Sequence, residues 1–129
     1  MLAIDTNLVV RYLTGDHPQQ SRKAKALIDA EPIFVCKTVF LEVEWVLRSV
    51  FGFTTAAITK ALTDFAGLPN VTLEDAPTIA KALDWMAGGM DFADALHLAS
   101  AQESDEFVTF DRGLAKKARK LSDFTVRVL

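Results

Sequence analysis

Apolar and polar positions follow two different periods along the chain, and together they predict a succession of strands and helices. Short apolar runs of strand length lie at residues 1–4, 32–36, 70–73, 106–110 and 124–129. Apolar residues recur every three or four positions, as in amphipathic helices, over residues 6–13, 19–30, 37–52, 54–67, 76–88, 91–102 and 112–121. This alternation indicates an α/β fold with a mainly parallel sheet of about five short strands.

Length and composition limit the class of protein. With 129 residues, half of them apolar, we expect one compact domain over residues 1–129. The single cysteine, Cys36, cannot form an internal disulfide, which fits the reducing cytoplasm. The chain starts on an apolar run without a basic leader, and no apolar stretch approaches the roughly 20 residues that span a bilayer. We therefore expect a soluble cytoplasmic protein with no membrane partner.

Two aspartates follow strand-like runs and precede helices. Asp5 ends the run that begins at Met1, where burial is expected, and Asp111 ends the run at 108–110. A buried carboxylate is costly unless it caps a helix, is paired or protonated, or binds a metal. The carboxyl ends of parallel strands share one sheet edge, where ligands bind in open α/β folds. Helix N-capping, worth about 1 kcal/mol, is the alternative role for each residue.

The helix at 37–52 contains two glutamates with different neighbours. Glu42 shares its helical face with Val39 and Trp45, so we expect it to point inward, where a protonated or snorkelling glutamate is the alternative to a metal ligand. Glu44 has Arg48 four residues on, the spacing of an ordinary exposed ion pair. We therefore interpret Glu44 as structural.

The segment at 91–102 adds two acidic candidates. Asp91 and Asp94 have the spacing of a capping box, in which both carboxylates are stabilised by the helix dipole. The same spacing places them on one helical face, with His97 one turn further along. We expect Asp94 to point into the region that the helix start faces, and His97 to act as a hydrogen-bonding or partly buried residue.

Asp5, Glu42, Asp94 and Asp111 would form a group of carboxylates without soft ligands. At close range they repel one another unless some are protonated or a hard cation neutralises them. Oxygen ligands favour Mg²⁺ or Mn²⁺ over zinc. These ions bind phosphate oxygens and activate water, so phosphodiester hydrolysis is the natural chemistry of such a group.

Four motifs of the chain resemble those of PIN-domain nucleases, in the order of that family. They are IDTN at 4–7, Glu42 within 40–49, DFADALHLA at 91–99, and VTFD at 108–111 before a basic helix. The resemblance implies a three-layer α/β/α sandwich with Asp5, Glu42, Asp94 and Asp111 as catalytic, Mg²⁺-binding residues. It further implies an auxiliary acidic residue and supporting polar groups, which are Asp91, Thr6, Asn7 and Thr109.

The chain's length and its N-terminal first motif resemble the VapC toxins of toxin–antitoxin pairs. This resemblance implies an endoribonuclease that cleaves RNA by metal-activated water, a VapB-like antitoxin, and a homodimer or a higher toxin–antitoxin assembly. RNA phosphates are expected to contact basic residues, for which a solvated helix face is the alternative: Arg11, Arg112, Lys116 and Lys117.

Two other classes of function fit the same residues. One is a different Mg²⁺-dependent phosphatase with Asp5 as nucleophile, although Asn7 stands where haloacid-dehalogenase-like enzymes have a second carboxylate. The other is a non-catalytic α/β interaction module whose acidic residues only cap helices. Divalent-ion binding separates the second class from the enzymes, and the substrate separates the first class from a nuclease.

Overall fold

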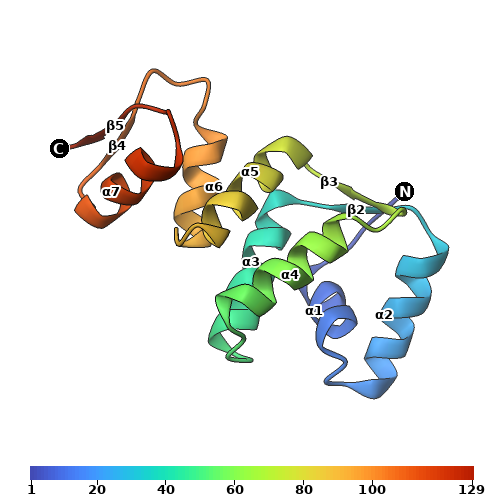
Figure 1. Ribbon diagram of the computed structural model, residues 1–129. Coiled ribbons are helices and arrows are strands. Elements are labelled where there is room, and N and C mark those ends of the chain that lie inside the picture. Colours follow the sequence, from blue (N-terminus) through green and yellow to red (C-terminus); the bar gives the residue numbers. More distant parts are fainter. The chain divides into compact units, whose positions relative to one another are not determined.

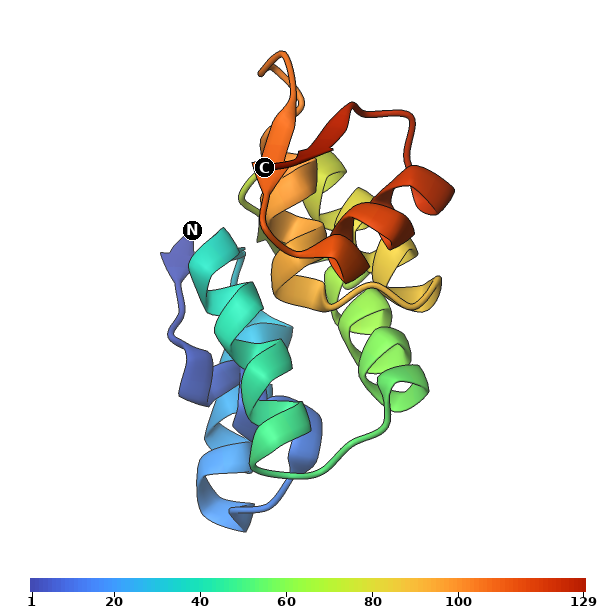
Figure 2. The ribbon, with the colours of Figure 1, turned by 90° about the vertical axis from the view of Figure 1, so that its left-hand side faces the viewer.

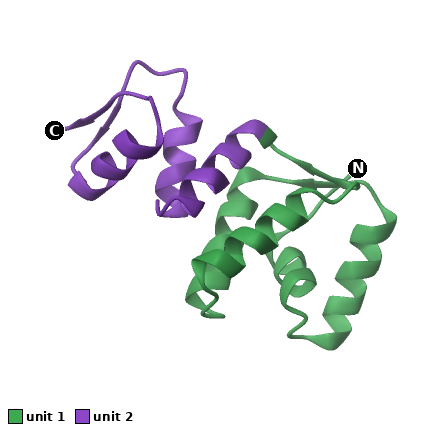
Figure 3. Cartoon of the chain, in the orientation of Figure 1, with its two compact units in different colours: residues 1–76 green, residues 77–129 purple.

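The structure is a computed structural model that describes residues 1–129, and the chain divides into two compact units. Unit 1 comprises residues 1–76 and unit 2 comprises residues 77–129 (Figure 3). Every strand pairing in both units is parallel. The predicted α/β class with five short parallel strands is therefore confirmed.

Unit 1 contains a parallel sheet of three strands in the order β1-β2-β3. Leu2 pairs with Ile33, and Ile33 pairs with Val71. Helix α1 packs against both α2 and α3, and α3 packs against α4 (Figures 1 and 2). The elements are β1 Leu2–Ala3, α1 Thr6–Thr14, α2 Pro18–Ala30, β2 Ile33–Val35, α3 Lys37–Ser49, α4 Thr55–Ala66 and β3 Val71–Leu73.

Unit 2 contains a parallel pair of strands, β4 and β5, in which Val108 lies opposite Arg127. Helix α7 connects these strands and packs against both, so they form a parallel β-α-β unit (Figure 1). The elements are α5 Ala76–Ala87, α6 Phe92–Ser100, β4 Phe107–Thr109, α7 Arg112–Leu121 and β5 Val126–Val128.

The core consists of the apolar positions that the helical and strand periods predict. The central strand β2 buries the β-branched residues Ile33 and Val35, which suit a strand paired on both sides. Helix α3 buries Phe40, Val43 and Leu47. In unit 2, the buried residues include Phe92, Leu98, Leu114 and Ala115. No helix is both long and apolar enough to cross a membrane.

Acidic and polar caps begin most of the helices, as their positions in the sequence predict. Asp5, Asp91 and Asp111 are the N-caps of α1, α6 and α7, and each accepts a hydrogen bond from a backbone N–H of its helix. His17 caps α2, which has Pro18 at its first position. The three aspartates therefore lie at helix N-termini, where backbone dipoles favour negative charge.

Candidate functional site

In unit 1 the candidate residues of the first two motifs line one cleft. Asp5, Thr6, Asn7 and Glu42 belong to its wall, and the cleft has a volume of about 470 Å³. The first three residues come from the start of α1, and Glu42 comes from the second turn of α3. The packing of α1 against α3 therefore places two carboxylates from distant parts of the sequence on the same cavity.

Asp5 caps α1 and is exposed, so the expectation that it is buried was wrong. Strand β1 ends at Ala3, and the chain passes through only one further buried residue, Ile4, before the helix begins. The backbone N–H of Thr6 donates a hydrogen bond of 2.7 Å to Asp5 Oδ1. Capping therefore uses one carboxylate oxygen, and Oδ2 makes no hydrogen bond within the protein.

Glu42 is held in the cleft by Thr6. The Thr6 hydroxyl donates to Glu42 Oε1 over 2.5 Å, which is in the range of charge-assisted O–H···O⁻ bonds. Thr6 itself is only 8% exposed, so its hydroxyl has a fixed position. This hydrogen bond is compatible with the supporting role that the resemblance implies for Thr6, and that role stays a prediction.

The two glutamates of α3 have the reverse of the expected burial. Glu42 is exposed, and Trp45 on the same face is 53% exposed, whereas Glu44 is 3% exposed. The buried face of the helix runs through Phe40 and includes Glu44, so the face of Glu42 points into the cleft instead of the core. The predicted Glu44–Arg48 pair exists, but its carboxylate is buried. Arg48 Nε lies 3.0 Å from Glu44 Oε2.

The wall of this cleft also contains an ion pair. Arg11 lies in its wall and is bound by Asp16, whose carboxylate oxygens both lie 3.2 Å from Arg11 Nη1. Asp16 was not among the predicted site residues. Its position five residues after Arg11, across the Gly15 turn, is the only signal of this contact in the sequence. Asn7 lines the cleft, and its supporting role stays a prediction.

In unit 2 three aspartates lie close enough to influence one another. Asp91 Oδ2 accepts a hydrogen bond of 3.1 Å from the Asp94 N–H, which is one half of the predicted capping box, and the return bond from the Asp91 N–H to the Asp94 side chain is not formed. Partial burial is the main cause that raises the pKa of the Asp94 carboxyl, and the negative charges of Asp91 and Asp111 raise it further. The nearby His97 lowers this pKa. The Asp94 side chain makes no hydrogen bond, so only the opposing effect of His97 offsets this repulsion.

Asp111 is exposed and caps α7 through a hydrogen bond of 2.9 Å from the Leu114 N–H to its Oδ1. The Thr109 hydroxyl accepts a hydrogen bond of 3.0 Å from the Asp111 N–H. Thr109 therefore fixes the turn that carries Asp111, and does not contact the carboxylate directly. The hydrogen bond from the Asp111 N–H to the Thr109 hydroxyl therefore supports the Asp111 carboxylate only through the backbone.

The basic residues of α7 differ in their environments. Arg112 and Lys116 are exposed. Lys117 is also exposed, but its Nζ donates a hydrogen bond of 2.6 Å to the carbonyl of Gly89, which precedes the Asp91 cap. Lys117 therefore ties the start of α6 to α7, a contact that the sequence pattern did not predict.

The structure thus gathers Asp5 with Glu42 in unit 1, and Asp94 with Asp91 and Asp111 in unit 2. Neither unit alone gathers three or more His, Cys, Asp or Glu side chains in an arrangement that could hold a metal ion. The donors are nevertheless those of a hard divalent cation, since they are carboxylate oxygens, and Glu42 is supported by the Thr6 hydroxyl. The repulsion at Asp94 also fits a bound cation.

The family model of the PIN domain matches residues 2–120. Among solved structures, the chain is similar to VapC20 of Mycobacterium tuberculosis, a toxin that cleaves the sarcin–ricin loop. The two are 17% identical with a TM-score of 0.46, over 90% of this chain and 94% of the VapC20 chain. No curated protein sequence gave a match.

Proposed function

Because the chain belongs to the PIN-domain family, whose members are nucleases that generally use divalent metal ions, we propose that it is a Mg²⁺-dependent endoribonuclease. Mn²⁺ is the alternative ion, since it accepts the same oxygen ligands. We assign Asp5, Glu42, Asp94 and Asp111 as its catalytic, metal-binding residues. The observation that carries the proposal is the cleft in which Asp5 and Glu42 lie together, with Thr6 bound to Glu42.

In this proposal one PIN domain includes residues of both units, since the family model extends across the boundary at residue 76. Asp5, Glu42, Asp94 and Asp111 supply the ligand oxygens. Asp91 reinforces the negative charge near Asp94. The bound ion supplies a Lewis acid for the phosphate oxygens and lowers the pKa of an attacking water.

The residues of the chain then have separate tasks. Asp5 and Asp111 keep one oxygen on a helix N–H, which fixes the direction of the other oxygen. Thr6 and Asn7 hold the geometry of the unit 1 cleft. Arg11, Arg112, Lys116 and Lys117 bind RNA phosphates, which positions the substrate without reading its sequence.

We further propose that the nuclease is a VapC-like toxin that acts in the cytoplasm as a homodimer and is inhibited by a VapB-like antitoxin, alone or in a higher assembly. Support comes from the four motifs in family order. A basic antitoxin side chain that reaches the carboxylates would compete with the metal ion, because it neutralises the same charge.

The test is cleavage of a defined RNA by the purified protein with Mg²⁺ and with a chelator. Asp5→Asn and Asp94→Asn each remove a ligand charge and keep the shape of the side chain. Asp105→Asn is the control, because Asp105 is exposed and makes no hydrogen bond or ion pair. We expect metal-dependent cleavage that both site variants lose and the control retains. Activity on p-nitrophenyl phosphate without RNA cleavage would indicate the phosphatase, and absence of Mg²⁺ binding would indicate an interaction module.

A further inference from the structure

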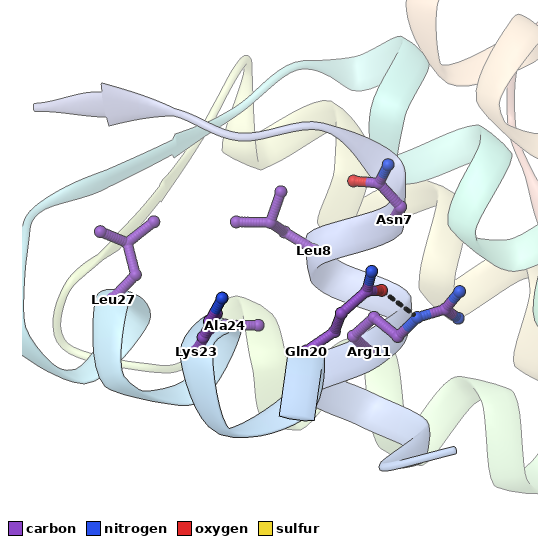
Figure 4. Close-up of a pocket in the computed structure, with 7 residues that line it drawn as sticks. All are labelled: Asn7, Leu8, Arg11, Gln20, Lys23, Ala24 and Leu27. Atoms are coloured by element: carbon purple, nitrogen blue, oxygen red, sulfur yellow. Dashed lines mark hydrogen bonds between the residues drawn. The ribbon is translucent and has the colours of Figure 1, made fainter. Parts of the chain in front are cut away.

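Unit 1 has a second cleft, between helices α1 and α2, that no residue of the four motifs except Asn7 lines. Its volume is about 460 Å³, within the range of roughly 300–1,000 Å³ for small-molecule sites. Figure 4 shows its wall, to which α1 contributes Asn7, Leu8 and Arg11, and α2 contributes residues such as Lys23 and Leu27. The cleft therefore has the size and the mixed apolar and polar wall of a ligand site.

The charged side chains of this wall are all cationic. Arg11 and Lys23 line the cleft, and no carboxylate does. Arg11 is already oriented, because its Nε donates to Gln20 Oε1 over 2.9 Å and its Nη1 pairs with Asp16. Nη2 of Arg11 and the ammonium group of Lys23 make no hydrogen bond within the protein. An anionic group is therefore the complementary ligand for these two side chains.

Part of the wall is apolar. Leu8 and Leu27 line it and are only partly buried, and in Figure 4 Leu27 lies on the side away from Arg11, with Leu8 between them. Partly buried leucines in a cleft gain from contact with a flat, weakly polar group such as a nucleobase. A nucleotide offers both parts, a phosphate for the cations and a base for the leucines.

The second cleft adjoins the acidic one, because Asn7 and Arg11 line both. A chain of phosphates that leaves Asp5 and Glu42 would reach the α1–α2 cleft past Arg11. We propose that the α1–α2 cleft is a binding subsite for the nucleotide of a single-stranded RNA next to the scissile phosphodiester. This inference rests on the proposed function, and it identifies a substrate-positioning site that the carboxylates alone do not provide.

The experiment measures binding of a fluorescent single-stranded hexaribonucleotide to the full chain over a range of salt concentrations. Asp94→Asn with Mg²⁺ serves as the background, so that the probe is not cut. Lys23→Ala removes one phosphate contact, and Arg22→Ala is the matched control, since Arg22 is the exposed neighbour on α2 that does not line the cleft. For Lys23→Ala we expect the slope of log K against log salt to fall by about 0.7, with binding roughly fivefold weaker at 0.1 M salt. Arg22→Ala should change neither.

A second measurement follows the methyl NMR signals of Leu8 and Leu27 during titration with the same RNA. Both should shift, and the signals of Leu62, which is buried in α4, should not. The proposal is wrong if the Lys23 and Arg22 variants behave alike, or if RNA binds without shifting these two leucines. It is also wrong if only a polypeptide partner shifts them, because the cleft is then a protein-docking surface.

The two proposals fail in different ways. If the wild-type protein cleaves RNA with Mg²⁺ but the Lys23 variant binds as the Arg22 variant does, only the subsite is refuted. If the wild-type protein neither binds nor cleaves RNA, the proposed function is refuted and the subsite with it.

Discussion

Replacement of Thr6 by valine tests whether Glu42 is positioned by its hydrogen bond. Valine has nearly the same shape and lacks the hydroxyl that lies 2.5 Å from Glu42 Oε1. A hydrogen bond to a charged group contributes about 1.5–3 kcal/mol, and we expect the lower end because Glu42 is exposed. At about 2.1 cal/mol/K per residue, 129 residues have an unfolding entropy of about 0.27 kcal/mol/K. Loss of about 1.5 kcal/mol therefore lowers Tm by about 5 °C.

The effect on metal binding should exceed the effect on stability. Loss of a group that orients a metal ligand typically costs about 10–100-fold in metal affinity or activity. We expect a change of this size for Thr6→Val in Mn²⁺ binding and in the Mg²⁺ dependence of RNA cleavage. Thr6→Ser keeps the hydroxyl and should restore most of both.

Thr59→Val is the matched control, since the Thr59 hydroxyl donates 2.8 Å to the Thr55 carbonyl on α4 and does not line the cleft. It should leave the metal affinity unchanged even if it lowers Tm. Equal metal affinities for the wild type and Thr6→Val would refute the positioning of Glu42 by Thr6. Equal losses in the Thr6 and Thr59 variants would show that the effect arises from general destabilisation.

Two further predictions concern the carboxylates of Glu44 and Asp94, which are wholly or partly buried. In a double-mutant cycle monitored by chemical unfolding, Glu44→Gln and Arg48→Met should show a coupling energy of about 1–3 kcal/mol, because the Glu44 side chain is 4% exposed. The exposed Lys60–Asp64 pair should give only about 0.3–0.5 kcal/mol, and equal couplings would refute the role of burial. Asp94→Asn should raise Tm at neutral pH in chelator, because burial and the charges of Asp91 and Asp111 disfavour the Asp94 carboxylate. Mg²⁺ should stabilise the wild type more than this variant, and a lower Tm in chelator would contradict the repulsion.

The fold class follows from local patterns that do not depend on how distant elements pack. The starts of α1, α2, α6 and α7 are set by side chains that bond to neighbouring backbone groups, and such signals are visible in the sequence. Strand ends are harder to place. The run at 124–129 forms a strand only over Val126–Val128, because pairing with β4 determines where the ladder stops.

The burial of α3 could not be predicted from its sequence because two faces of this helix carry both apolar and acidic residues. Trp45 suggested that the face of Glu42 is buried, but the packing of Phe40, Val43 and Leu47 against the rest of the molecule selects the other face. Glu44 is then buried and needs Arg48 as a partner. Helical periodicity alone shows which side chains share a face of the helix, and only the tertiary structure decides which face is buried in the core.

Asp111 shows why capping and catalysis are compatible roles for one residue. Its Oδ1 accepts the Leu114 N–H over 2.9 Å, and Oδ2 takes no part in this cap. Asparagine caps a helix about as well as aspartate does, whereas alanine loses about 1 kcal/mol. Asp111→Asn should therefore keep the stability of the wild type and lose metal-dependent cleavage, and Asp111→Ala should lose both. If Asp111→Asn retains full cleavage, the carboxylate serves only as a cap, and the ligand set must be built from Asp5, Glu42 and Asp94.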